Sequence, residues 1–509
     1  MADEEQTSPS RRGLPILLGP LLASLVFVFP PEGLSPEAIR VLFITIWTAV
    51  WWMTEAIPIP ATSLLPALLL PTLGVTPAAD AAKYYAHWIL FLLLGGFIIA
   101  RGIEASGLHR RIALGILARV GESRRALVFG FLLASAFLSM WISNTATTLM
   151  LVPIGLSVVR TIERDSDSKG SPTAFGAALL LAIAYGANVG GIGSLIGTPP
   201  NLIFANAVEE LRTTQSNLAE GWAPDFPSWL LVGTPVVLIF IPIIGLLLTR
   251  VLFRLPAGGG AESTEFLNQE RLAQGAITTR ERRVMVVFLV VGFLWVFRGS
   301  SAMPGWIDLL IALGWFQEET AGSFFRDSSA ALFGAILMFV IPRERGSRQG
   351  LVNWDEVQTV PWGVLLLLGG GFAIAGEFSN TGLSDAIGSA MARWSDAPAP
   401  VLIGGISMAT AFLTEITSNT ASTNMLMPIL SSAAVAGGTP PLILLLPAVL
   451  SVSFAFTLPV ATAPNAIVFA TGRIPILAMV RCGLVLNIVG PCVVLFVIYV
   501  IVKPIFGLG

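Results

Sequence analysis

Long apolar runs follow one another along almost the whole chain, and few of them contain an ionisable side chain. Several reach the length of about 18 residues that crosses a bilayer as an α-helix. The pattern therefore predicts an all-α polytopic membrane protein. The runs lie near residues 14–30, 37–53, 59–75, 86–106, 126–159, 174–196, 228–253, 284–298, 329–342, 361–381, 399–438, 441–471 and 475–503.

The composition leads to the same class of protein. Of the 509 residues, 54% are hydrophobic and 12% are charged, and the mean hydropathy is +0.80, whereas soluble proteins carry about 25% charged residues. These values exclude a soluble enzyme and a secreted disulfide scaffold, and the net charge of −2 excludes a nucleic-acid binder. Residues 1–13 are predicted to form a cytoplasmic tail, because Arg11 and Arg12 precede the first apolar run. We expect a multi-pass protein of the inner cell membrane with a cytoplasmic N-terminus.

Two halves of the chain repeat one another on either side of a polar segment, 254–283, which is predicted to be a cytoplasmic linker. Three short motifs recur at a shift of 275 residues, and a proline motif recurs at a shift of 264. The sequence therefore predicts two repeats, 14–253 and 284–509. The matching pairs are Leu92–Phe97 with Leu367–Phe372, Gly107-Leu108 with Gly382-Leu383, Ser143-Asn144-Thr145 with Ser418-Asn419-Thr420, and Thr198-Pro199-Pro200-Asn201 with Thr462-Ala463-Pro464-Asn465.

Loop charges indicate how the two repeats are oriented. Residues 101–125 contain six arginines, whereas the equivalent residues 376–400 contain only Arg393 beside three acidic residues. Because basic loops tend to stay in the cytoplasm, the first stretch is predicted inside and its copy outside. This is an inverted repeat, an architecture typical of secondary transporters. A parallel duplication whose loop charges have drifted is the alternative.

Each half contains an apolar stretch with a polar triplet at its centre. The first stretch, 126–159, is too long for one span and too short for two, and arginines flank both of its ends. It predicts a re-entrant helical hairpin at 124–163, with its counterpart at 398–439. The two triplets would then meet near the middle of the bilayer. Ser, Asn and Thr also cap helix N-termini, so plain capping is the alternative interpretation.

The proline motifs predict broken helices near 193–201 and 459–465, because proline removes a backbone donor and interrupts a helix. Helix N-termini attract anions, while free carbonyl ends suit cations. Neither the triplets nor the breaks contain Arg or Lys, so an anion there must be neutralised by helix dipoles, polar donors and bound cations. Oxygen ligands of this kind suit an alkali cation. The sequence thus predicts cation-coupled uptake of an anion.

Taken with Trp52–Pro58, the paired triplets and proline motifs resemble the divalent anion:sodium symporter family across nearly the whole chain. The resemblance implies about eleven transmembrane helices plus two re-entrant hairpins, a homodimer in the lipid bilayer, and an elevator movement. It also implies sodium-coupled import of a small dianion, a C4-dicarboxylate such as succinate, malate or fumarate. Sodium ions would be the coupling ions, and no organic cofactor is implied.

The resemblance also assigns residues to each ligand. One sodium ion would be bound by Ser139, Ser143, Asn144 and Gly197, and a second by Thr414, Ser418, Asn419 and Ala461. Ala463 departs from the Thr-Pro-Pro-Asn motif that the family often has in both halves, at a position expected to border the substrate. The substrate residues would be Ser143, Asn144, Thr145, Thr198, Ser418, Asn419, Thr420 and Ala463.

Several alternatives remain open at this point. A sodium-independent dicarboxylate exchanger and a transporter of sulfate or citrate share the expected fold. Glu415, inside the second hairpin, is either a proton or cation site or a carboxylate that faces a polar cavity or an arginine. An enzyme is not expected, because the sequence has no HExxH motif and His87 and His109 stand alone. Paired inverted hairpins favour alternating access over an open channel.

Overall fold

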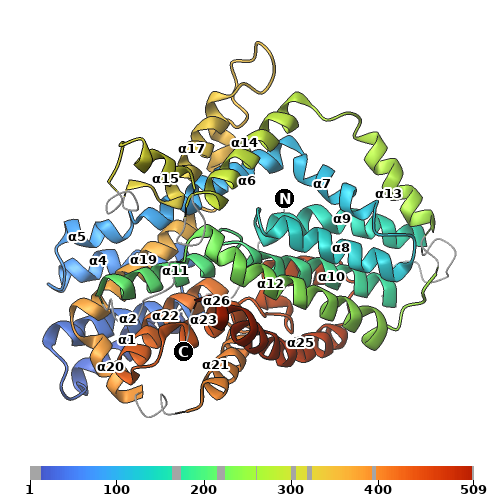
Figure 1. The fold of residues 1–509 in the computed structure, drawn as a ribbon. Helices are drawn as coiled ribbons and strands as arrows, with labels where there is room; N and C mark the ends of the chain where they lie inside the picture. Colours follow the sequence, from blue (N-terminus) through green and yellow to red (C-terminus); the bar gives the residue numbers. More distant parts are fainter. Residues whose placement is uncertain are drawn as a thin grey trace.

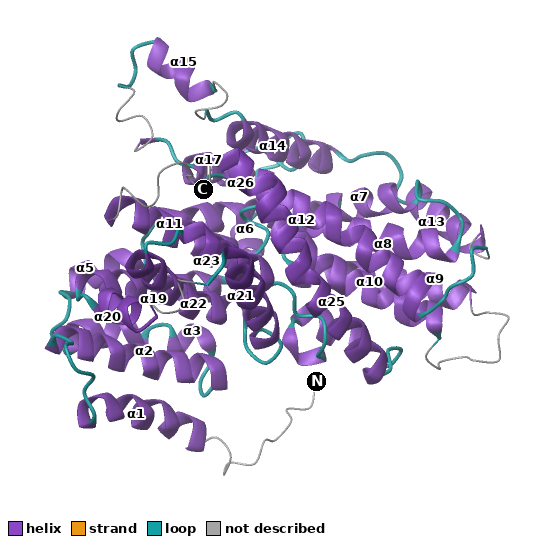
Figure 2. Cartoon of the chain, turned by 60° about the horizontal axis from the view of Figure 1, so that its bottom comes forward, coloured by secondary structure: helices purple, strands orange, loops and turns teal. Residues whose placement is uncertain are grey.

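The computed structural model describes residues 13–162, 173–214, 224–258, 261–299, 305–317, 324–391 and 397–506, and these residues form helices without any β-strand (Figures 1 and 2). The prediction of an all-α protein is confirmed. Residues 1–12 of the expected tail and residue 163 of the expected first hairpin lie outside the described residues.

Among the helices of the first half, one continues into a tighter 3₁₀ turn and another into a wider π-helical segment. They are α1 (Gly13–Val28), α2 (Pro36–Thr54), α3 (Ile59–Thr62), α4 (Leu65–Thr72), α5 (Ala78–Tyr84), α6 (Trp88–Ser106), α7 (Leu108–Leu117), α8 (Arg124–Ser139), α9 (Asn144–Ile162), α10 (Ala174–Gly190) with the 3₁₀ turn η1 (Gly191–Gly193), α11 (Pro199–Thr214), and α12 (Phe226–Leu246) with the π-helical η2 (Leu247–Leu252).

Helix α13 and the start of α14 lie within the predicted linker, and the helices from α19 onward follow the same order as those from α6 onward. The helices are α13 (Ala261–Ala273), α14 (Thr279–Val296), α15 (Trp306–Ala312), α17 (Asp327–Val340), α18 (Trp354–Gln358), α19 (Trp362–Asn380), α20 (Leu383–Met391), α21 (Ala399–Leu413), α22 (Asn419–Gly437), α23 (Pro441–Ser451), the 3₁₀ turn η4 (Pro459–Ala461), α24 (Ala463–Phe469), α25 (Ile476–Val497), the π-helical η5 (Ile498–Val502) and α26 (Lys503–Phe506).

Six helices in the described part of the chain are long and apolar enough to cross a membrane. One of them, Ala174–Gly193, is wholly buried inside the protein, so it forms the centre of the fold. Others carry exposed apolar side chains that suit contact with lipid tails, such as Leu238 and Ile488. The six are Trp88–Ser106, Asn144–Ile162, Ala174–Gly193, Phe226–Leu252, Trp362–Asn380 and Ile476–Phe506.

Close packing of α8 on α10 positions the turn between α8 and α9. A Cβ atom at Gly186 would lie 2.6 Å from the carbonyl oxygen of Leu132, and one at Gly190 would lie 2.3 Å from that of Ala136. Only glycine allows this approach, because a side chain would overlap the backbone of α8. The end of α8 is therefore held directly against the end of α10.

The buried helix α10 also joins the two halves of the chain. The Tyr185 hydroxyl donates to the carbonyl oxygen of Phe456 at 2.9 Å. The Asn188 amide donates to Asn465 Oδ1 at 3.1 Å and to Thr462 Oγ1 at 3.2 Å. Both α10 side chains are buried, so these contacts fix the proline motif of the second half against the centre of the first.

Candidate substrate and sodium site

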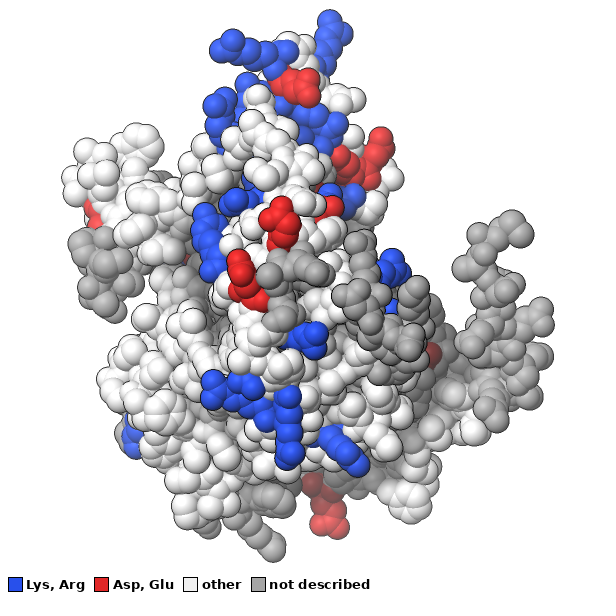
Figure 3. All heavy atoms as spheres, turned by 90° about the vertical axis from the view of Figure 1, so that its right-hand side faces the viewer, with Lys and Arg blue, Asp and Glu red and all other residues white. Residues whose placement is uncertain are grey.

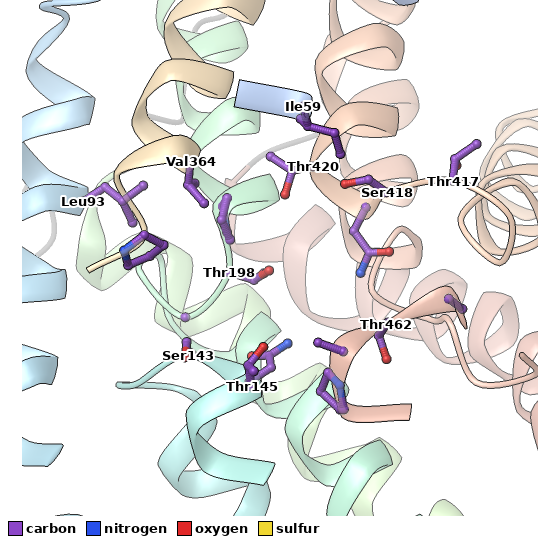
Figure 4. Close-up of a pocket in the computed structure, with 18 of the residues that line it drawn as sticks. Ile59, Leu93, Ser143, Thr145, Thr198, Val364, Thr417, Ser418, Thr420 and Thr462 are labelled. Atoms are coloured by element: carbon purple, nitrogen blue, oxygen red, sulfur yellow. The ribbon is translucent and has the colours of Figure 1, made fainter. Parts of the chain in front are cut away.

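A cavity of about 840 Å³ opens where the two polar triplets and the two proline motifs come together (Figure 4). Its size falls within the range of small-molecule sites. Of the residues predicted to bind substrate or sodium, all line this cavity except Ser139 and Thr414, which are fully buried behind it. The lining residues are Ser143, Asn144, Thr145, Gly197, Thr198, Ser418, Asn419, Thr420, Ala461 and Ala463.

Four helices begin at residues that line the cavity, namely α9, α11, α22 and α24. Each N-terminus carries partial positive charge and unpaired N–H groups. The cavity's described lining contains no Lys, Arg or His, and its ionisable residues are Glu55 and Glu415. Positive potential for an anion must therefore come from helix ends and from bound cations.

In the first half, three oxygen atoms gather behind the triplet. Ser139 Oγ lies 2.6 Å from Asn144 Oδ1 and 2.8 Å from the carbonyl oxygen of Ala187. The serine hydroxyl has one proton and can donate to only one of these two oxygens at a time. Such a surplus of oxygen acceptors, with no acidic side chain among them, fits an alkali cation.

The second half repeats this arrangement with the corresponding residues. Thr414 Oγ1 contacts Asn419 Oδ1, and it donates to the carbonyl oxygen of Val452 at 2.9 Å. Ser139 is the last residue of α8, and Thr414 is the residue that caps the C-terminus of α21. A hydroxyl side chain therefore stands at the end of the first helix in each pair. The two halves therefore offer equivalent oxygen clusters.

The asparagine that closes each proline motif ties down the loop before it. Asn201 Nδ2 donates to the carbonyl oxygens of Gly191 and Ser194 at 3.0 and 2.8 Å. Asn465 Nδ2 donates to those of Ala455 and Leu458 at 2.9 and 3.0 Å. Buried carbonyls need such partners, so both loops have a fixed shape beside the cavity.

Glu415 is 4% exposed and acts as an acceptor for a loop of the second half. Its carboxylate accepts from the backbone N–H groups of Phe456 and Thr457 at 2.8 Å, from that of Leu458 at 3.0 Å, and from Asn487 Nδ2 at 2.7 Å. Glu415 lines the polar cavity. Its hydrogen-bond donors among the described residues are backbone and side-chain amides, not an arginine.

The two triplet serines differ in their contacts. Ser143 Oγ accepts from the backbone N–H of Ala146 at 3.2 Å and so caps α9. Ser418 is the N-cap residue of α22, but its side chain makes no capping hydrogen bond. Capping therefore accounts for part of the role of Ser143, and it does not account for the presence of serine at the same place in the second half.

Sequence reasoning missed part of the cavity. Thr462 lines it and caps α24, and its equivalence to Thr198 in the repeat could have revealed it. The opposite wall is mostly apolar and comes from α3, α6 and α19, which carry Ile59, Leu93 and Val364 (Figure 4). No local signal marked these three positions, because any apolar helix residue would satisfy the same pattern.

One rim of the cavity adjoins a cluster of basic residues. Thr359 lines the cavity and donates to the carbonyl oxygen of Glu356 at 2.8 Å. Arg280 and Arg343 bind the Glu356 carboxylate at 3.0 and 2.9 Å. Burial by itself raises the pKa of Glu356, but hydrogen bonds from the backbone N–H of Asn353 and from Arg280 lower the pKa overall. The carboxylate is therefore ionised and suited to pair with both arginines.

Comparison with known proteins identifies the family. The sequence model of a protein family, described as the sodium:sulfate symporter transmembrane region, matches residues 15–508. A sodium-dependent dicarboxylate transporter, SdcS, from Staphylococcus saprophyticus is 37% identical, and the alignment covers 97% of this chain and 92% of that protein. SdcS from Staphylococcus aureus is 36% identical with the same coverage.

Solved structures with similar folds are also transporters. The YdaH transporter of Alcanivorax borkumensis superposes with a TM-score of 0.54 at 16% identity, covering 91% of this chain and 98% of that chain. MtrF of Neisseria gonorrhoeae, which illustrates a class of antimetabolite efflux pumps, gives 0.56 at 15% identity, covering 98% and 97%. The chain belongs to the divalent anion:sodium symporter family, and it is a membrane transporter rather than an enzyme.

Proposed function

We propose that the protein imports C4-dicarboxylates such as succinate, malate and fumarate together with sodium ions. The observation that carries this proposal is a cavity with four helix N-termini, two equivalent oxygen clusters and no basic side chain in its described lining. A dicarboxylate bound there needs cations to offset its charge, so the affinities for substrate and sodium become coupled. The names of the relatives, sodium-dependent dicarboxylate transporters, support this substrate class.

In this proposal one sodium ion binds near Ser139, Ser143, Asn144 and Gly197, and a second binds near Thr414, Ser418, Asn419 and Ala461. The dicarboxylate binds between them, where Asn144, Thr145, Thr198, Asn419 and Thr420 line the cavity. Each asparagine would then contact both a cation and the substrate, which makes binding of the two cooperative. Ala463 and the two triplet serines would border the substrate.

The proposed membrane architecture is an inverted repeat of about eleven transmembrane helices and two re-entrant hairpins, α8–α9 and α21–α22. The repeated hydrogen bonds of Ser139 and Thr414, and of Asn201 and Asn465, support the duplication. The arginine-rich segment 101–125 supports a cytoplasmic base for the first hairpin. We also propose a homodimer in the inner cell membrane with the N-terminus and the 254–283 linker in the cytoplasm.

An elevator movement fits the two unlike walls of the cavity. The polar wall comes from the hairpin ends and the proline motifs, while Ile59, Leu93 and Val364 belong to an apolar wall past which it could slide. The rim at Thr359 adjoins the basic cluster of Arg280 and Arg343, which is expected on the cytoplasmic side. The conformation described above is therefore proposed to be inward-open.

Uptake of labelled succinate into proteoliposomes tests the function. We expect uptake that saturates, rises with external sodium and does not respond to potassium. Uptake that is independent of sodium and requires dicarboxylate inside the proteoliposomes would show that the protein is an exchanger and not a symporter. Competition separates the anions: succinate, malate and fumarate should compete, whereas stronger competition by sulfate or citrate would reassign the substrate.

Ser418→Ala should raise the sodium concentration for half-maximal uptake several-fold with little change in thermal stability. Ser143→Ala should raise it similarly and also lower the stability by about 1 kcal/mol, because it removes a helix cap. Sodium titrations of uptake and thermal unfolding of both variants measure the two effects. Unchanged sodium dependence in both variants would contradict the assigned sites.

A further inference from the structure

A second opening, a groove of about 650 Å³, lies between α7, α8 and α14 and is closed at one side by α13. Its arginines are Arg111, Arg119 and Arg271, and the rest of its lining is mainly apolar. It is separate from the candidate transport cavity, since the two share no lining residue. Basic side chains spread over the neighbouring face of the molecule that carries α13 (Figure 3).

Two of the three arginines are available to bind an anion. Arg111 is paired with Glu281 at 2.9 Å. Arg119 and Arg271 are exposed and have no acidic partner within the described residues, although one Arg119 nitrogen donates to the carbonyl oxygen of Gly115. Planar guanidinium groups bind phosphate oxygens in a bidentate manner.

Helix α8 contributes apolar side chains to the same groove. Leu133 and Phe137 are 42% and 41% exposed, and they lie about one helical turn apart on α8. Met285 of α14 and Ile112 of α7 form the neighbouring walls. An occupant therefore needs both an anionic group and an apolar body.

We propose that this groove binds one anionic phospholipid of the cytoplasmic leaflet, with its phosphate on Arg119 and Arg271 and an acyl chain along Leu133 and Phe137. Basic pockets on the cytoplasmic side of a membrane protein suit anionic headgroups. The occupant is a lipid rather than a soluble anion because half-exposed apolar side chains line the groove together with the arginines. One wall is the first helix of the α8–α9 pair, so the bound lipid stabilises this pair against α7 and α14.

Lipid binding to the full-length protein in neutral detergent tests the proposal, with phosphatidylglycerol and phosphatidylcholine of the same acyl chains as probes. The wild type should bind phosphatidylglycerol in preference to phosphatidylcholine. Arg119→Gln with Arg271→Gln should weaken phosphatidylglycerol binding about 25-fold, or about fivefold for each arginine. Native mass spectrometry of the bound lipid, with titration of each lipid, gives the affinities.

Two matched variants separate a built site from general attraction. Arg345→Gln with Arg348→Gln removes the same charge from exposed positions outside the groove and should leave the affinity unchanged. Gly115→Phe keeps every arginine and places a ring in the groove, where a Cβ would meet only the end of the Arg119 side chain, so it should abolish the lipid preference. Equal losses in the two double variants, or full binding by Gly115→Phe, would overturn the proposal. Thermal unfolding of each variant without lipid reports whether it is folded.

Discussion

Replacing Glu415 with alanine should reduce succinate uptake by at least about 100-fold, because several buried donors lose their acceptor at a cost of ~1–3 kcal/mol each. The donors are the backbone N–H groups of Phe456, Thr457 and Leu458 and the amide of Asn487. They shape the loop that precedes the second proline motif, so the second oxygen cluster should be lost with them. Uptake rates and sodium titrations in proteoliposomes measure the effect.

A matched substitution of the other carboxylate in the cavity provides the control. Glu55→Ala removes an exposed side chain that lines the same cavity. It should change uptake by less than about threefold, since no buried donor among the described residues depends on it. Glu415→Gln keeps one acceptor oxygen, so its uptake rate should lie between those of Glu415→Ala and the wild type. If Glu415→Ala transported at the wild-type rate, the described role of this side chain would be wrong.

Gly197→Ala should be almost as damaging, with a loss of uptake of about 100-fold. A Cβ atom at this position would lie 2.5 Å from the carbonyl oxygen of Gly191. This contact joins two backbone segments, so relieving it requires one of the segments to shift. The displacement, worth ~3 kcal/mol, would separate the loop from the Asn144 side chain at the first sodium site. The measurement is uptake at saturating sodium together with the sodium concentration for half-maximal rate.

The equivalent position of the second half supplies the control for Gly197. Ala461 already carries a Cβ atom there, so Ala461→Gly should lower uptake no more than about threefold through added backbone freedom. Equal effects of the two substitutions would mean that the close approach to Gly191 does not matter for transport.

The order of apolar runs was sufficient to predict an all-helical membrane protein, because a helix that crosses the bilayer must present apolar side chains to the lipid. It was not sufficient to predict where the run 441–471 is interrupted. Helix α23 ends at Ser451, well before the proline motif, and Glu415 holds the N–H groups that follow. That contact joins residues about forty positions apart, so no local pattern records it.

The candidate site was predicted mainly because the chain contains each motif twice. Ser143 and Ser418 stand out through this repetition, and the structure places both at one cavity. The apolar wall and the role of Asn188 were not predicted, because a single asparagine in an apolar run does not reveal which carbonyl or side chain it will meet. Helix α13 was also not expected within the polar linker, where Leu267 supplies a fully buried contact.

The dependence of succinate affinity on sodium in the purified protein tests the central claim most directly. Isothermal titration with succinate should show binding that strengthens steeply as sodium replaces potassium, because the described cavity lining offers no basic side chain to neutralise two carboxylates. Asn144→Ala and Asn419→Ala should each weaken this sodium dependence. Succinate binding of equal strength in potassium alone would contradict the account.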